Sequence, residues 1–187
     1  DFKQNNWTAK RYAEFINWCM DNDIDARAHC VYWETATGIE NRGDYLLPAI
    51  GNANWNVDSV SVDEVRARLE KQINIISTYI GDYPIEIDVM NEIATRHDDG
   101  IKSVGWDEGV RMYQMDKAIR PNAKLVHLET IPGNTSPVGT ALPDHVAYTK
   151  YLKDLGAPID MCGIQGHIGS AAHPQYWYVN IDMAAQA

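Results

Sequence analysis

With 187 residues, 45% of them hydrophobic and 22% charged, the chain is long enough to bury a sizeable core as one globular domain. A formal net charge of −10 and a pI near 4.9 argue against a nucleic-acid backbone or an anionic membrane surface as partner, and they favour an uncharged ligand. No run of about 18 apolar residues occurs, which predicts no transmembrane helix.

The first predicted elements are a helix over residues 8–22 and a strand over residues 24–33. Thr8 is the expected N-cap of this helix. Its apolar residues recur at helical spacing and predict one buried face, made of Tyr12, Phe15, Ile16, Cys19 and Met20. The strand alternates in polarity and leads into a long loop over 34–58, a length typical of functional loops.

Later segments continue this alternation of helix and strand. A capping box at Ser61 and Glu64 opens a helix that is expected to end at Gly81. Further helices are predicted over 106–120, over 143–155 and after Pro174, and strands over 85–91, 123–129 and 159–165. Strands separated by helices, without hairpin signals, predict a parallel α/β fold. If the units close into a barrel, catalytic groups are expected at the C-terminal ends of the strands.

Several common catalytic and metal-binding motifs are absent from the sequence. There is no G-x-S-x-G elbow, Walker loop or G-x-G-x-x-G, which argues against acyl transfer and nucleotide chemistry. His29, His127 and His167 are not arranged in the close pairs typical of zinc hydrolases. The cysteines lack metal-ligand spacing and are predicted to be buried thiols: Cys19, Cys30 and Cys162. We therefore expect no metal and no cofactor.

One candidate for acid catalysis is the carboxyl group of Glu92. It directly follows Asn91 at the end of the apolar strand 85–91, where partial desolvation favours a protonated carboxylic acid. Asn91 offers a neighbouring donor and acceptor for a substrate hydroxyl. The alternative interpretation is that Glu92 is a solvated residue that opens a loop.

Other polar and aromatic side chains share strand faces by alternation. His29 and Trp33 lie four residues apart on one strand face. If that face points into the mouth of a barrel, the imidazole can bond sugar hydroxyls and the indole can form a stacking wall. A satisfied core histidine is the competing interpretation of His29. The same alternation pairs Gln165 with His167 on the last strand and His127 with Glu129 on the strand before.

Four segments together resemble glycoside hydrolase family 10, the endo-β-1,4-xylanase family. AHCVYWE (28–34) resembles the G-H-x-x-x-W motif of the third barrel strand, and IDVMNEI (87–93) resembles the W-D-V-V-N-E-A motif of the fourth. PNAKLVHLET (121–130) resembles the fifth-strand stretch P-x-A-K-L…N-D-Y-N. LGAPIDMCGIQGHIG (155–169) is similar to the G-V-P-I-D-G-I-G-x-Q-x-H motif of the sixth strand.

The resemblance implies a partial (β/α)8 TIM barrel over residues 1–187, and a retaining endo-glycosidase acting on a β-1,4-xylan-type polysaccharide. By this resemblance Glu92 is the general acid/base, Asp88 supports it from behind, and His167 orients the nucleophile. The expected substrate-binding residues are His29, Trp33, Asn91, Gln165 and Glu129. A secreted or extracytoplasmic location is also implied by the family.

Two features bear on completeness and specificity. The nucleophile of the family is a Glu on the seventh strand, expected beyond residue 187, and the first two strands are expected before residue 1. We therefore expect a second copy or companion segment to complete the barrel, because open strand edges favour association. Leu128 and Glu129 stand where the family has Asn-Asp. The alternative functions are hydrolysis of another β-glycan by a related enzyme and glycan binding without catalysis.

Overall fold

The computed structural model describes residues 6–33, 61–63, 66–67, 70–71, 73–74, 81, 83, 86–93, 105–130, 141–166, 178 and 181–185. Its elements, in chain order, are α1 (Asn6–Asp21), β1 (Arg27–Trp33), β2 (Glu86–Asn91), α5 (Trp106–Ile119), β3 (Lys124–Glu129), α6 (Ala141–Asp154) and β4 (Met161–Ile164). The strands form one sheet in the order β1-β2-β3-β4, and every neighbouring pair is parallel. The predicted parallel α/β alternation is therefore confirmed.

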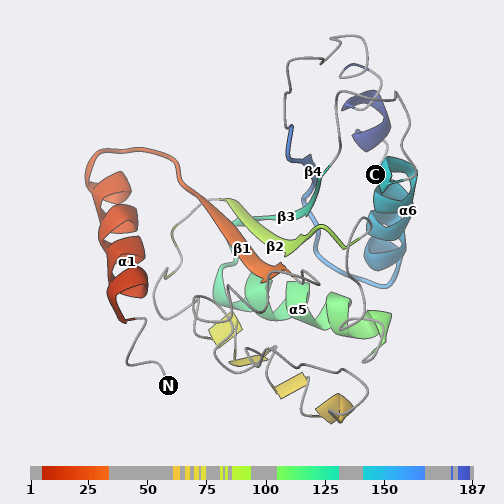
Figure 1. Cartoon of the computed structure of the whole chain (residues 1–187), viewed down its shortest axis with the longest axis horizontal. Helices are drawn as coiled ribbons and strands as arrows, with labels where there is room; N and C mark the ends of the chain where they lie inside the picture. Colours follow the sequence, from red (N-terminus) through yellow and green to blue (C-terminus); the bar gives the residue numbers. More distant parts are fainter. Residues whose placement is uncertain are drawn as a thin grey trace.

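The sheet is the centre of the main hydrophobic core. In Figure 1, α5 runs across one face of the sheet, α6 lies beyond β3 and β4, and α1 stands at the opposite side. Ile87, Val89 and Met90 of β2 are fully buried, as expected for a parallel strand that is covered on both faces. Gly109 of α5 lets β2, α5 and α6 approach closely, since a Cβ there would lie 3.3 Å from side-chain atoms of Met90 and Leu152.

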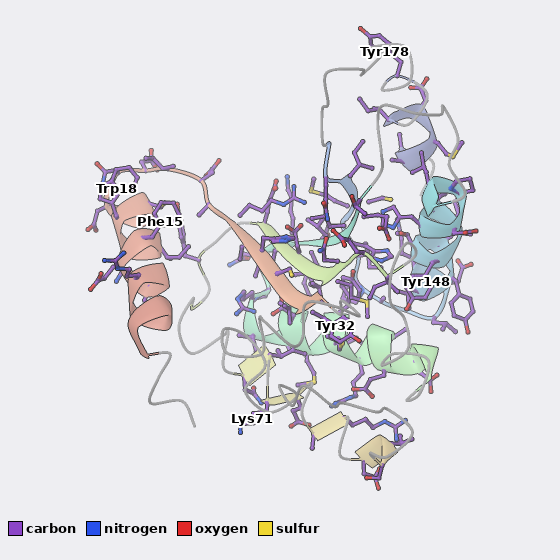
Figure 2. All side chains as sticks on the ribbon, viewed as in Figure 1. Phe15, Trp18, Tyr32, Lys71, Tyr148 and Tyr178 are labelled. Carbon is purple, nitrogen blue, oxygen red and sulfur yellow. The ribbon has the colours of Figure 1, made fainter. Side chains whose placement is uncertain are left out.

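Helix α1 differs from its prediction in both its start and its buried face. It begins at Asn6, so Thr8 lies in the first turn and the predicted N-cap is wrong. Ile16 and Cys19 are buried, but Phe15 is 55% exposed and Met20 is also exposed. Phe15 and Trp18, both exposed, are labelled on α1 in Figure 2. The two rings stack with centroids 6.3 Å apart. The predicted face is too wide because, within the described part of the chain, the residues that pack with Ile16 and Cys19 are Ala26 and Tyr83.

Most other element predictions agree with the structure to within a few residues. β1 begins at Arg27 rather than at residue 24, and β4 covers only Met161–Ile164 of the predicted 159–165. Gly81 and Gly156 adopt positive φ angles of 66° and 95°, as helix-terminating glycines do. Residues 62–63, 66–67, 70–71 and 73–74 are helical within the helix predicted after Ser61, whereas the predicted loop 34–58 and the side chain of Tyr12 lie outside the described residues.

Burial of the cysteine thiols is confirmed for two of the three. Cys19 and Cys30 are buried, Cys162 is half-buried, and none of them forms a disulfide among the described residues. Within the same part of the chain, no helix combines the length and the apolar character that a membrane crossing requires.

A buried polar cluster links β3, β4 and α6 behind the sheet. Thr149 donates its hydroxyl proton to the carbonyl of His145 and therefore accepts from His127 Nδ1–H, at 2.7 Å in each case. His145 Nε2 lies 3.1 Å from Gly163 O and 3.1 Å from Cys162 Sγ. Because a carbonyl only accepts, His145 carries its proton on Nε2. Both imidazoles are held in one neutral tautomer each.

Acidification is expected to destabilise the fold through these two histidines. Burial lowers the pKa of His127 well below its ordinary value, and burial lowers the pKa of His145 to about 4 against the opposing effect of the Gly163 carbonyl. Below about pH 6.5 the unfolded chain therefore binds protons at these histidines, whereas the native chain does not. The contribution of the two neutral histidines to the free energy of unfolding is therefore fully present above that pH. It falls by roughly 3 kcal/mol through His145 alone as pH approaches 4.

Urea unfolding between pH 7 and pH 4 measures this effect, with His145→Leu as the comparison. The variant should lose stability less steeply than the wild type, because one buried proton acceptor has been removed. Parallel curves for the two proteins would contradict the role of His145.

Candidate active site

A bulge in β2 places polar side chains that would otherwise lie on opposite faces of the strand on one face of the sheet. Asp88 pairs with Val126, whereas Met90 pairs with the next residue, His127, so β2 contains one extra residue at this point. Without the bulge, Asp88 and Asn91 would point to opposite faces. The hydrogen bonds described below bring both of them to side chains that line one hollow on the sheet.

Glu92 leaves strand geometry immediately after β2. Its φ of 60° lies in the left-handed region, which is uncommon for residues other than glycine, and its N–H donates to Leu128 O of β3 at 2.9 Å. As a result, the consecutive side chains of Asn91 and Glu92 meet the same donor. Gln165 Nε2 lies 2.9 Å from Asn91 Oδ1 and 2.6 Å from Glu92 Oε1.

This cluster of Asn91, Glu92 and Gln165 is largely shielded from solvent. Asn91 is 1% exposed and Glu92 is 6% exposed. Asn91 Nδ2 is a buried donor that has no hydrogen-bond partner within the described part of the chain. Buried polar groups are nearly always paired, so this donor beside a carboxyl group is a candidate hydrogen-bonding group for a ligand.

A second polar group comes from β1 and β2. Arg27 donates to Asp88 Oδ1 from Nε at 3.0 Å and from Nη2 at 2.5 Å, and His29 Nδ1 lies 3.0 Å from Asp88 Oδ2. Because the Asp88 carboxylate accepts, His29 carries its proton on Nδ1, and its Nε2 is an acceptor while the ring is neutral. The His29 side chain is 45% exposed, whereas that of Asp88 is 2% exposed. Asp88 therefore fixes an imidazole that remains accessible.

A hollow of about 340 Å³ joins the two groups. Its lining residues are Arg27, His29, Asp88, Leu128, Ile164 and Gln165. Leu128 and Ile164 supply apolar surface, and the remaining residues supply hydrogen-bonding groups. Polar groups placed around an apolar surface are typical of a site for a small ligand or one unit of a polymer. Among the residues that the structure describes, no three His, Cys, Asp or Glu side chains are grouped to hold a metal ion.

The structure brings together some of the residues predicted from the sequence. Glu92, Asn91 and Gln165 form one cluster, and His29 lies at the same hollow. Asp88 contacts His29 and Arg27, so its carboxylate supports His29 directly rather than Glu92.

Other predicted site residues are placed differently or not described. Trp33 pairs through its backbone with Asn91, and its side chain lies outside the described residues, as does His167. The register shift between His29 and Tyr32 breaks the alternation that predicted a shared face for His29 and Trp33. Glu129 is fully buried, and its carboxylate accepts from Thr130 N–H at 2.8 Å.

Arg27 was missed by the sequence reasoning. It neutralises part of the Asp88 charge and lines the hollow, and its Nη1 also lies 3.6 Å from Glu86 Oε2. The signal was present, because Arg27 precedes His29 by two positions and strand alternation places both on one face. A charged residue two places before a candidate ligand on a strand is a reason to consider the pair together.

Comparison with known proteins identifies one family. The family model described as Glycosyl hydrolase family 10 matches residues 1–187. "Endo-1,4-beta-xylanase 1" of Arabidopsis thaliana is 27% identical over 167 residues, which cover 86% of this chain and 15% of the plant protein. "Endo-1,4-beta-xylanase 2" of the same plant is 25% identical over 176 residues, which cover 90% of this chain and 14% of that protein.

Solved structures give the same fold. Xylanase XynB from Paenibacillus barcinonensis, complexed with a conduramine derivative, superposes with a TM-score of 0.72 at 20% identity, covering 92% of this chain and 50% of that one. Xylanase 10B from Thermotoga maritima gives a TM-score of 0.71 at 19% identity, with the same two shares covered. The chain thus spans about half the length of these structures and has the fold of part of a (β/α)8 barrel.

Proposed function

The chain belongs to glycosyl hydrolase family 10, and from this premise we propose that it forms half of the catalytic barrel of a retaining endo-glycosidase acting on β-1,4-xylan-type polysaccharides. The observation that carries the proposal is the cluster of Asn91, Glu92 and Gln165 at the ends of β2 and β4. It presents a shielded carboxyl group next to an orphaned amide donor, which suits a glycosidic oxygen beside a sugar hydroxyl.

In this proposal Glu92 acts first as acid and then as base. Its proton passes to the glycosidic oxygen while the bond from that oxygen to the anomeric carbon breaks, and a carboxylate nucleophile bonds to the same carbon. In the second step ionised Glu92 takes a proton from water, whose oxygen replaces the nucleophile. Asn91 Nδ2 donates to the neighbouring sugar hydroxyl throughout.

The remaining proposed contacts rest on the hollow for His29 and on the family resemblance for Trp33 and His167. His29 Nε2 accepts a hydrogen bond from a sugar hydroxyl, because Asp88 holds the neutral imidazole with its proton on Nδ1. Trp33 serves as a stacking wall, and His167 orients the nucleophile. Glu129 stays a proposed substrate-binding residue, with a buried carboxylate that accepts from Thr130 N–H.

Completion of the barrel is part of the proposal. β1 and β4 are the outer strands of the four-stranded sheet that the structure describes. A retaining mechanism needs a second carboxyl group about 5–5.5 Å from Glu92. We propose that further polypeptide of the same barrel supplies both the missing strands and this nucleophile.

The proposal is tested with the complete barrel enzyme on β-1,4-xylan and on other β-glycans of the same linkage. Reducing-sugar release should be greatest on xylan, and ¹H NMR of the first product should show the β-anomer. Initial release of the α-anomer would overturn the retaining mechanism. Because Leu128 gives the hollow an apolar wall where the family has Asn, preferred turnover of another glycan would indicate a related specificity. Binding of xylo-oligosaccharides without turnover would indicate a glycan-binding protein.

A further inference from the structure

Gln165 and Glu92 are anchored on the same strand from opposite sides. Gln165 N donates to Glu129 O at 2.9 Å, and Glu92 N donates to Leu128 O at 2.9 Å, so both backbones are bonded to the end of β3. Their side chains come from positions 73 residues apart and meet beyond that strand. The contact between them is therefore fixed by the sheet and does not depend on a long loop.

The chemistry of the amide decides which oxygen of Glu92 can be protonated. An amide nitrogen has two N–H groups and donates only. Both hydrogens of Gln165 Nε2 are engaged, one with Asn91 Oδ1 at 2.9 Å and the other with Glu92 Oε1 at 2.6 Å. An ionised carboxylate only accepts hydrogen bonds, so it is stabilised by the nitrogen of the Gln165 amide and not by the oxygen. Glu92 Oε1 is thus held as an acceptor.

We propose that Gln165 is the positioning residue of the acid/base: it confines the acidic proton of Glu92 to Oε2 and stabilises the ionised carboxylate that remains after proton transfer. This inference rests on the proposed function of Glu92. The proton leaves Oε2 for the glycosidic oxygen and returns from water, while Gln165 neither gains nor loses a proton. Since both N–H groups are already engaged, the substrate-binding role expected of Gln165 from the sequence falls to its side-chain oxygen, which accepts hydrogen bonds and belongs to a residue that lines the hollow.

Two substitutions separate this role from a merely structural one. Gln165→Met keeps the length of the side chain but removes the donor, so the ionised form of Glu92 loses a charge-assisted hydrogen bond. Gln165→Glu places a second carboxyl group against Glu92, and two close carboxyl groups resist double ionisation. The pH midpoint of Glu92 ionisation should therefore rise by about one unit or more from the wild type to the Met variant. In the Glu variant the two carboxyl groups titrate as a pair, and the upper of their two midpoints should lie higher than the Glu92 midpoint of the wild type.

The midpoint is measured by ¹³C NMR on protein labelled at the glutamate side-chain carboxyl carbon, with the Glu92 signal identified by its loss in Glu92→Gln. In the wild type, the Gln165 side-chain N–H signals should also shift as Glu92 titrates, which tests the contact without any substitution at Gln165. Gln114→Met is the matched control, because that amide lies on α5 and contacts Gly156 O. It should leave the Glu92 midpoint unchanged.

Turnover gives the second measurement. Gln165→Met should lower kcat about tenfold to a hundredfold with little change in KM, and it should move the alkaline limb of the kcat/KM profile to higher pH. Equal Glu92 midpoints in all three proteins, with no response of the Gln165 signals, would overturn the inference. The NMR signals do not require turnover. Shifted midpoints in a protein that hydrolyses no glycan would therefore support the effect of Gln165 on Glu92 and overturn the proposed function instead.

Discussion

Glu92→Gln in the complete barrel is expected to lower kcat on xylan by about 10²–10⁴-fold, because the amide has no acidic proton to give to the leaving oxygen. The change is nearly isosteric, so the shielded position of Glu92 and its backbone bond to Leu128 should persist. Reducing-sugar assays at the pH optimum of the wild type measure the loss.

Substrates with different leaving groups separate the acid step from the base step. An aryl xyloside with a strongly acidic phenol as leaving group needs no proton for bond cleavage, so its first step should be affected far less than that of xylan. A burst of phenol followed by slow turnover is expected, since the second step still lacks its base. Added azide should accelerate that step, because an anionic nucleophile needs no base.

Glu86→Gln is the control for the loss of a carboxyl group from the same strand. Glu86 lies at the other end of β2, and its Oε2 lies 3.6 Å from Arg27 Nη1. This variant should retain most of its activity. Undiminished xylan turnover by Glu92→Gln would remove the acid/base assignment.

Arg120→Met is expected to cost roughly 3–5 kcal/mol of unfolding free energy, because it leaves a buried charge without its partner. Arg120 and Asp116 are both 0% exposed, and they form an ion pair within the C-terminal part of α5 and its cap. Arg120 Nε also donates to Gly81 O at 2.8 Å. Burial raises the pKa of Asp116, and the charge and hydrogen bond of Arg120 oppose this rise.

Thermal and urea unfolding of the purified protein measure the effect, and a drop in Tm of about 10 °C is expected for a chain of this size. The matched control is Lys117→Met on the same helix, because Lys117 forms its ion pair with Asp160 at the surface. Exposed pairs contribute about 0–1 kcal/mol, and the hydrogen bond from Lys117 Nζ to Ala123 O at 2.7 Å contributes about 1 kcal/mol, so this control should lose far less stability than Arg120→Met. Replacing Asp116 by Leu in the Arg120→Met background should recover part of the loss, since no charge then remains buried. Equal stability of Arg120→Met and Lys117→Met would contradict the buried-pair explanation.

The elements and their order were predictable from the sequence because periodicity and capping report local structure. The strand predicted over 85–91 is found as Glu86–Asn91, and the helix predicted over 106–120 is found as Trp106–Ile119. The position of Glu92 at the end of a buried strand was also predictable. These features depend on residues that are close together in the chain.

The geometry of the site was not predictable, because it depends on departures from regular structure. One extra residue in β2 puts Asp88 and Asn91 on one face, and a positive φ turns Glu92 toward the partner of Asn91. Neither departure has a signature in residue spacing. The exposure of Phe15 likewise depends on which elements cover α1, information that helical periodicity does not contain.

The bridge from Gln165 to Glu92 also has a consequence for the order of events as the polypeptide is synthesised. β2 and β3 can pair once residue 129 has emerged, but Gln165 reaches Glu92 only after α6 and β4 have followed. A nascent chain that stops short of β4 therefore holds the carboxyl group without its amide donor. The backbone amide of Gln165 is bonded to Glu129 O, so its protection from hydrogen exchange would mark the moment at which β4 has docked and the Gln165 side chain can reach Glu92.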